Sequence, residues 1–182
     1  IYGSYYFYNR KEIKDLISYL KLIYNDKDEI SLRRIINVPK RGIGDATVSK
    51  VMDFVENYEI SLWDGLSEVR TIPTLTARNC TGIENFMNLM DEFMVLSETI
   101  PVSTLIETIL KDTGYMKELE NSKDIEDKSR IENLKELVSD AVDFEKTSED
   151  KSLSAYLEKV SLVQDTDKLQ EEDENGSVVL MT

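Results

Sequence analysis

The sequence predicts a mainly α-helical protein with a short β-strand at each end. Only 3 prolines and 7 glycines interrupt 182 residues, so long regular elements are expected. Apolar residues recur at three- and four-residue intervals through most of the chain, which is the period of amphipathic helices. The two ends differ: residues 1–8 are rich in tyrosine and residues 178–182 form an apolar run, and both compositions favour extended backbone.

Each predicted helix is bounded by polar residues, glycine or proline. Asn9, followed by Glu12 three residues later, resembles a capping box at the start of the first helix. Ser61 and Ser152 are placed to cap two later helices, and Gly114 is placed to end another. The expected helices cover residues 9–24, 31–37, 47–58, 61–66, 78–97, 101–113, 125–146 and 152–160. An acidic turn at 165–176 then leads into the final strand.

Several absences limit the chemistry of the chain. It contains no histidine, which removes Ser-His-Asp triads and His-ligated metal sites. It also lacks the G-x-x-x-x-G-K-[ST] and G-x-G-x-x-G phosphate-binding patterns. The single Cys80 excludes an internal disulfide and fits a reducing cytoplasm. We therefore expect no catalytic residue, metal site or cofactor in the chain itself, and the lack of a long apolar run predicts no membrane partner.

Charge is distributed unevenly along the chain. The net charge of −14 argues at first sight against nucleic-acid binding, because phosphate repels an acidic protein. Residues 31–50, however, contain one acid, Asp45, and are locally +4. The basic residues of this window are Arg33, Arg34, Lys40, Arg41 and Lys50.

A glycine-rich turn lies inside the basic window. Residues 34–47 read R-I-I-N-V-P-K-R-G-I-G-D-A-T, which predicts a helix, a Gly-Ile-Gly turn and a second helix. Such a helix-hairpin-helix arrangement suits DNA, because glycines let a phosphate approach the backbone and the N–H groups of the following helix attract its charge. The alternative is a plain turn between two helices, whose glycines only reverse the chain.

Residues 5–15, Y-Y-F-Y-N-R-K-E-I-K-D, place aromatic side chains beside basic ones. Aromatic rings of this kind can stack on the bases of single-stranded nucleic acid. The interpretation that we favour is that Phe7 and Tyr8 belong to the core, while Arg10 and Lys11 form a solvated first turn.

Several segments resemble motifs of one protein family. Residues 7–15 resemble F-Y-x-R-x-E-I-K-D, residues 34–44 resemble R-I-[IV]-N-x-P-x-R-G-I-G, and residues 178–182 resemble the opening of V-x-L-M-T-x-H. Shorter matches lie at 113–115, 130–134 and 150–153. In order and spacing, the whole chain is similar to part of the PcrA/UvrD/Rep-type superfamily 1A DNA helicases.

The resemblance implies that residues 1–24 and 177–182 are edges of a RecA-like domain, 2A, and that residues 25–170 form a helical subdomain, 2B, inserted within it. In this family a Gly-Ile-Gly turn contacts the backbone of duplex DNA ahead of the fork. The resemblance assigns this contact to Lys40, Arg41, Gly42, Ile43, Gly44 and Thr47. It places Phe7, Tyr8, Arg10, Glu12, Lys14, Asp15 and Thr182 in motifs of 2A.

We therefore expect a regulatory segment of a bacterial, cytoplasmic 3′–5′ DNA helicase. The chain lacks an initial methionine and the Walker motifs, so we expect a piece of a longer protein that cannot hydrolyse ATP alone. The whole helicase would use ATP and Mg²⁺, and its partners would be a duplex–single-strand DNA junction and the remaining helicase domains. The alternative is a protein-interaction or autoinhibitory module with little DNA binding of its own, which the charge of −14 favours.

Overall fold

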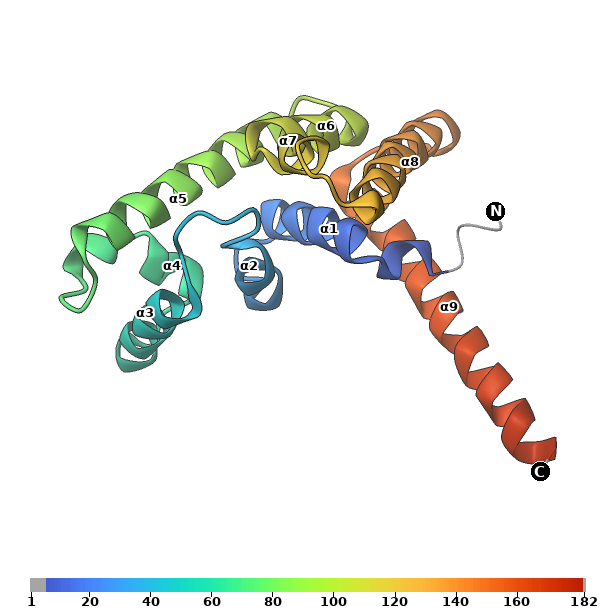
Figure 1. The fold of residues 1–182 in the computed structure, drawn as a ribbon, viewed down its shortest axis with the longest axis horizontal. Helices are drawn as coiled ribbons and strands as arrows, with labels where there is room; N and C mark the ends of the chain where they lie inside the picture. The colour runs from blue at the N-terminus through green and yellow to red at the C-terminus, as the bar shows by residue number, and fades with distance from the viewer. Residues whose placement is uncertain (1–5, 182) are drawn as a thin grey trace.

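The computed structural model describes residues 6–181, with side chains through residue 174. This part of the chain is built from helices, as Figure 1 shows, and the predicted mainly α class is confirmed. The elements in order are η2 (Phe7–Asn9), α1 (Lys11–Tyr24), α2 (Glu29–Ile35), α3 (Asp45–Tyr58), α4 (Leu62–Leu66), η3 (Val69–Thr71), α5 (Ala77–Ser97), α6 (Val102–Asp112), α7 (Tyr115–Glu120), α8 (Ile125–Thr147) and α9 (Leu153–Met181).

Helix α1 is the centre of the packing. It contacts α2, α5, α6, α8 and α9, and almost every side chain from Glu12 to Ile23 is buried. A helix that is apolar on several faces needs neighbouring helices on several sides, because each apolar face has to be removed from water. The predicted boundary at residues 24–25 stays a prediction; in this structure α1 and α2 pack together closely.

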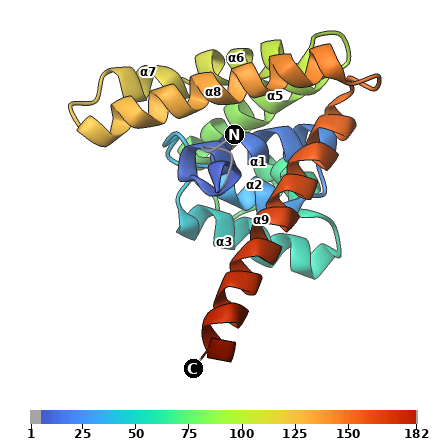
Figure 2. The same ribbon diagram turned by 90° about the vertical axis from the view of Figure 1, so that its right-hand side faces the viewer.

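The other helices lie on two sides of α1. Figures 1 and 2 show α5, α6, α7 and α8 on one side, and α2, α3 and α4 on the other. The first part of α9 packs against α1 and η2, where Tyr156 and Val160 are fully buried. The C-terminal part of α9 extends away from the other helices in both views. Among residues 6–181, no helix combines the length and the apolar character that a membrane span requires.

Most helix boundaries follow the capping residues. The Ser61 side chain accepts a hydrogen bond from the Asp64 N–H at 3.1 Å, and Ser152 accepts one from the Ala155 N–H at 3.2 Å. Gly114 takes the left-handed conformation, with φ of 78°, between the C-cap of α6, Thr113, and the start of α7. The first helix is an exception: its N-cap is Arg10 and makes no side-chain capping bond, so the predicted capping box at Asn9 is wrong.

The predictions for the C-terminus were also wrong. Residues 165–176 were predicted as a turn and 178–182 as a strand, but α9 continues through both to Met181. Acidic, lysine, glutamine and leucine residues are mostly compatible with a helix, and no proline interrupts them. A strand needs a neighbouring strand to satisfy its backbone groups, and residues 6–181 contain none, whereas a helix satisfies them internally.

At the N-terminus, residues 7 and 8 of the predicted strand belong to a 3₁₀ turn, η2, instead. A left-handed Tyr6 with φ of 62° precedes this turn, so the backbone is not extended there. The rest of that predicted strand, residues 1–5, lies outside the described residues, as does Thr182.

Candidate functional site

The loop between α2 and α3 carries the predicted glycine turn. Gly42 has φ of +77°, a backbone conformation that favours glycine, whereas Gly44 is extended, with φ of −77° and ψ of 174°. A Cβ atom placed on either glycine would meet no heavy atom within 4 Å. Both glycines are exposed, so the outer side of this loop is open to a ligand.

The first turn of α3 begins directly after Gly44. Gly44 offers no side chain, and the helix has no side-chain cap at this end. The N–H groups at the start of a helix have no intrahelical acceptor, and the helix dipole gives them positive character. The start of α3 and the open glycine loop together form an anion-attracting surface, on which the exposed Asp45 carboxylate is the opposing charge.

Asn37 determines the shape of the glycine loop. Its side-chain oxygen accepts hydrogen bonds from the N–H of Arg41 at 2.7 Å and from the N–H of Ile43 at 3.2 Å. One amide oxygen therefore holds two backbone groups on either side of Gly42. The sequence analysis did not single out Asn37 as a site residue, although asparagine is typical of turns in which its side chain bonds to nearby backbone.

The predicted DNA-contacting residues do not all face outward. Lys40 is exposed, together with the two glycines. Ile43 is 1% exposed, and Thr47 is also buried, so neither side chain faces outward. Arg41 directs its guanidinium inward, where it donates to the carbonyl oxygens of Ile35 and Ile36 at 2.7 and 3.0 Å.

Glycine on α5 allows the loop to lie against that helix. A Cβ at Gly82 would be 3.4 Å from the Arg41 carbonyl oxygen and 3.7 Å from Cγ1 of Ile43. A larger side chain would displace the loop, because backbone cannot move aside as easily as a flexible side chain. Gly82, which the sequence analysis did not identify, thus sets the distance between α5 and the glycine loop.

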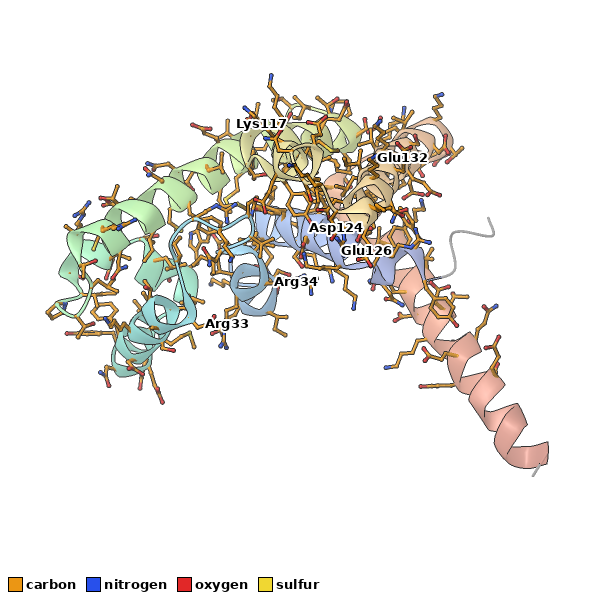
Figure 3. All side chains as sticks on the ribbon, in the orientation of Figure 1. Arg33, Arg34, Lys117, Asp124, Glu126 and Glu132 are labelled. Carbon is orange, nitrogen blue, oxygen red and sulfur yellow. The ribbon has the colours of Figure 1, made fainter. Side chains whose placement is uncertain are left out.

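The two arginines of α2 have different environments. Figure 3 shows Arg33 and Arg34 projecting to different sides of the helix. The Arg34 Nε lies 2.9 Å from Oδ1 of the buried Asp15, and Arg34 also donates to the Lys11 carbonyl oxygen at 3.3 Å. Arg33 is exposed, and so is Lys50 on α3. The basic window therefore divides into residues that face solvent and residues that join helices.

The residues of the N-terminal motif mostly hold helices together. Phe7 and Tyr8 are 4% and 3% exposed, which confirms the interpretation that they belong to the core. The Tyr8 hydroxyl donates to Asp140 at 2.6 Å, and the Tyr156 hydroxyl donates to the same carboxylate oxygen at 2.9 Å. Lys159 completes this cluster with a 2.8 Å contact to the other oxygen of Asp140.

A second part of the motif contacts α8. Asn133 accepts a hydrogen bond from the Arg10 guanidinium at 2.6 Å and donates one to the buried Glu12 carboxylate at 2.7 Å. The Glu12 carboxylate is therefore satisfied although it is removed from water. Lys14, in contrast, is exposed on the outer side of α1.

Asp15 joins three helices. Besides the contact with Arg34, its second oxygen accepts a hydrogen bond from the Tyr115 hydroxyl at 2.7 Å. Burial and the neighbouring Asp15 charge raise the pKa of the Tyr115 hydroxyl well above its ordinary value. The resemblance places Asp15 in a 2A motif; within this chain Asp15 stabilises the packing of α1, α2 and α7.

Metal-binding groups are not assembled in the part of the chain that the structure describes. No set of three or more His, Cys, Asp or Glu side chains is close enough there to hold a metal ion. Cys80 is buried, with its sulfur 3.5 Å from the Val69 carbonyl oxygen. The glycine loop and the start of α3 present groups that suit an anionic ligand.

The class of protein follows from sequence relations, which identify a UvrD-like helicase. The chain matches the model of the UvrD-like helicase C-terminal domain over residues 1–182, and it belongs to that family.

Individual relatives agree with this assignment. The chain is similar to ATP-dependent DNA helicase PcrA of Bacillus subtilis (strain 168), with 37% identity over 186 residues, covering 100% of this chain and 25% of that protein. PcrA of Staphylococcus epidermidis (strain ATCC 12228 / FDA PCI 1200) and of Staphylococcus aureus (strain NCTC 8325 / PS 47) are each 40% identical over 182 residues, 99% of this chain and 24% of theirs. The chain thus spans about a quarter of the length of these relatives.

Proposed function

We propose that this chain is the 2B subdomain, with edges of 2A, of an ATP-dependent 3′–5′ DNA helicase, and that it binds the backbone of duplex DNA without sequence specificity. The observation that carries the proposal is the open backbone surface formed by Gly42, Gly44 and the uncapped start of α3, with Lys40 exposed beside it. Backbone N–H groups and a lysine attract phosphate but do not read bases.

In this proposal the nucleotide-binding site lies in other parts of the helicase. ATP and Mg²⁺ would be bound by domains outside this chain, which contains no phosphate-binding loop pattern. In this proposal the chain is not an ATPase on its own; it is a cytoplasmic accessory element that contacts the duplex at a junction and packs on the remaining helicase domains. We propose DNA repair or replication as the setting of this helicase.

The first experiment measures binding of the chain to a fluorescently labelled duplex–single-strand junction by anisotropy, over a range of salt concentrations. Lys40→Ala should weaken binding and reduce the slope of log K against log salt by about 0.9, since one phosphate contact is lost. Lys123→Ala, which removes an exposed lysine between α7 and α8, is the matched control and should bind as the unaltered chain does.

Gly44→Ala tests the backbone contact separately. The φ and ψ of Gly44 are accessible to alanine, and the added methyl group would meet no protein atom, so the fold should be retained. The methyl group would nevertheless stand where a phosphate has to approach the start of α3. We expect binding to weaken about tenfold, or ~1.4 kcal/mol; unchanged binding would contradict this contact.

A protein-interaction or autoinhibitory module is the second candidate. The net charge of −14 favours it, because long-range repulsion opposes the approach of DNA to the isolated chain. If the unaltered chain binds no junction DNA even at low salt, this second function replaces the first.

A further inference from the structure

We propose that Arg41 is a positioning residue, which orients the glycine loop for an anion and makes no phosphate contact itself. The proposal rests on the proposed function, since the loop is the DNA-binding element in both. The resemblance assigns Arg41 to DNA contact, and its positive charge agrees with that role; we propose a structural role for Arg41 instead.

The guanidinium of Arg41 is engaged inside the protein. It donates to the carbonyl oxygens of Ile35 and Ile36, at the C-terminal end of α2, and to the hydroxyl of Tyr19 on α1. Carbonyl groups at the end of a helix have no intrahelical partner and carry partial negative charge, so a cation satisfies them well. The Tyr19 hydroxyl in turn donates to the Val38 carbonyl oxygen, in the first part of the loop.

Aromatic rings cover the same guanidinium. Its central carbon lies 4.9 Å from the centroid of the Phe86 ring on α5 and 5.8 Å from that of Tyr19. Contacts of this kind between arginine and a ring face are attractive. Arg41 therefore joins α1, α2 and α5 underneath the loop, and it would have to leave all of these contacts to reach a phosphate outside.

The backbone of Arg41 is held as well as its side chain. Its N–H is bonded to the Asn37 side chain, which also holds the N–H of Ile43. Gly42, with its positive φ, thus lies between two fixed residues. The conformation of the exposed backbone at Gly42 and Gly44 therefore depends on the contacts that Arg41 and Asn37 make on the inner side of the loop.

The test compares Arg41→Lys and Arg41→Ala with Lys40→Ala in the whole chain. Lysine keeps the positive charge but cannot reproduce the planar fork of donors. If Arg41 positions the loop, Arg41→Lys should weaken binding to the junction about tenfold, and the salt slope of both Arg41 variants should match that of the unaltered chain, because no phosphate contact is lost. Lys40→Ala should lower the slope, as proposed above.

Direct contact gives the opposite result. The proposal is overturned if Arg41→Lys retains full affinity while Arg41→Ala lowers the salt slope by about 0.9. A control for general destabilisation is Leu137→Ala, which opens a cavity in α8, a helix that packs on α1, α6 and α7. The folded fraction of this control should bind normally; if it loses as much affinity as Arg41→Lys, Arg41 has only a general structural role and the proposal fails.

Hydrogen exchange of the Ile43 amide tests the proposal without DNA. In Arg41→Lys this amide should exchange at least about tenfold faster, because the loop loses its inner contacts, while the amides of α8 keep their protection. Unchanged exchange at Ile43 overturns the proposal. If the unaltered chain binds no DNA, the proposed function fails, and this measurement still decides whether Arg41 holds the loop.

Discussion

At the level of single residues, the start of α3 combines groups that attract an anion with one that repels it. The exposed backbone at Gly44 and the nearby Lys40 favour phosphate, whereas Asp45 adds a negative charge to the first turn. An acid at this position also stabilises α3 through the helix dipole. The Asp45 charge therefore stabilises helix α3 and at the same time lowers the affinity of this surface for an anion.

This conflict predicts opposite effects for Asp45→Asn. DNA binding should become about threefold tighter, since a repulsive charge is removed, while the unfolding free energy should fall by about 0.3–1 kcal/mol. Anisotropy and urea unfolding measure the two effects on the same sample. Weaker binding by the variant would show that a bound phosphate does not lie near this end of α3.

Tyrosine hydroxyls that donate to the carboxylates of Asp15 and Asp140 should determine the response of the protein to alkaline pH. Burial and the nearby carboxylates Asp140 and Asp15 raise the pKa of Tyr8, Tyr115 and Tyr156 above the ordinary value of 10.0. Above about pH 10 the unfolded chain releases these protons while the folded chain retains them. Stability is therefore fully present below pH 10 and should fall as the pH rises further.

Tyr115→Phe isolates one of these groups. Above about pH 10, the unfolding free energy of the variant should decline less steeply with pH than that of the unaltered chain. The two slopes should differ by up to ~1.4 kcal/mol per pH unit. The variant should be less stable near about pH 8, because Asp15 loses a hydrogen bond. Denaturant unfolding across this range, with tyrosinate absorbance, provides the measurement; identical slopes would exclude Tyr115 as a contributor.

At the level of elements, the glycine loop is placed by its contact with α5. The loop does not carry its own hydrophobic core; Ile43 enters the core beside Gly82, and Arg41 lies over the Phe86 ring. The surface that would meet DNA is therefore formed by α2 and α3 but supported by a helix that follows them in the chain.

Two substitutions at Gly82 test this support. Gly82→Ala should leave binding unchanged and stabilise the chain by up to about 1 kcal/mol, because alanine favours the helix and its Cβ would only make ordinary contacts. Gly82→Leu should push the loop away from α5 and weaken junction binding at least about tenfold. Equal binding by the two variants would show that the distance between α5 and the loop is unimportant.

At the level of the whole molecule, a run of acidic residues lies at a distance from the α2–α3 loop along the chain. The exposed lysine and glycines belong to the α2–α3 loop, whereas a run of four acidic residues lies on the part of α9 that extends away from the other helices in Figure 1. That part carries Glu171, Glu172, Asp173 and Glu174. If the chain binds DNA as proposed, the negative field of this run should slow the approach of DNA without a contact to the loop.

Neutralising these four acids to glutamine or asparagine should raise the association rate with junction DNA. The effect should be severalfold at low salt and should disappear at about 1 M salt, where charges are screened beyond about 3 Å. Stopped-flow anisotropy at two salt concentrations measures the rate. A rate increase that persists at high salt would contradict long-range repulsion as its cause.

The sequence by itself determined the helical class, most helix boundaries and the family. These depend on signals within a few residues: apolar periodicity, Ser61 and Ser152 as caps, and Gly114 as a left-handed end. Tertiary structure decided the roles of charged side chains and the end of the chain. The Arg41 guanidinium meets the hydroxyl of Tyr19, which lies 22 residues away in the chain, and Arg10 meets Asn133 across 123 residues. Local sequence does not encode such partners, and α9 replaces the predicted strand because the described chain offers no strand to pair with.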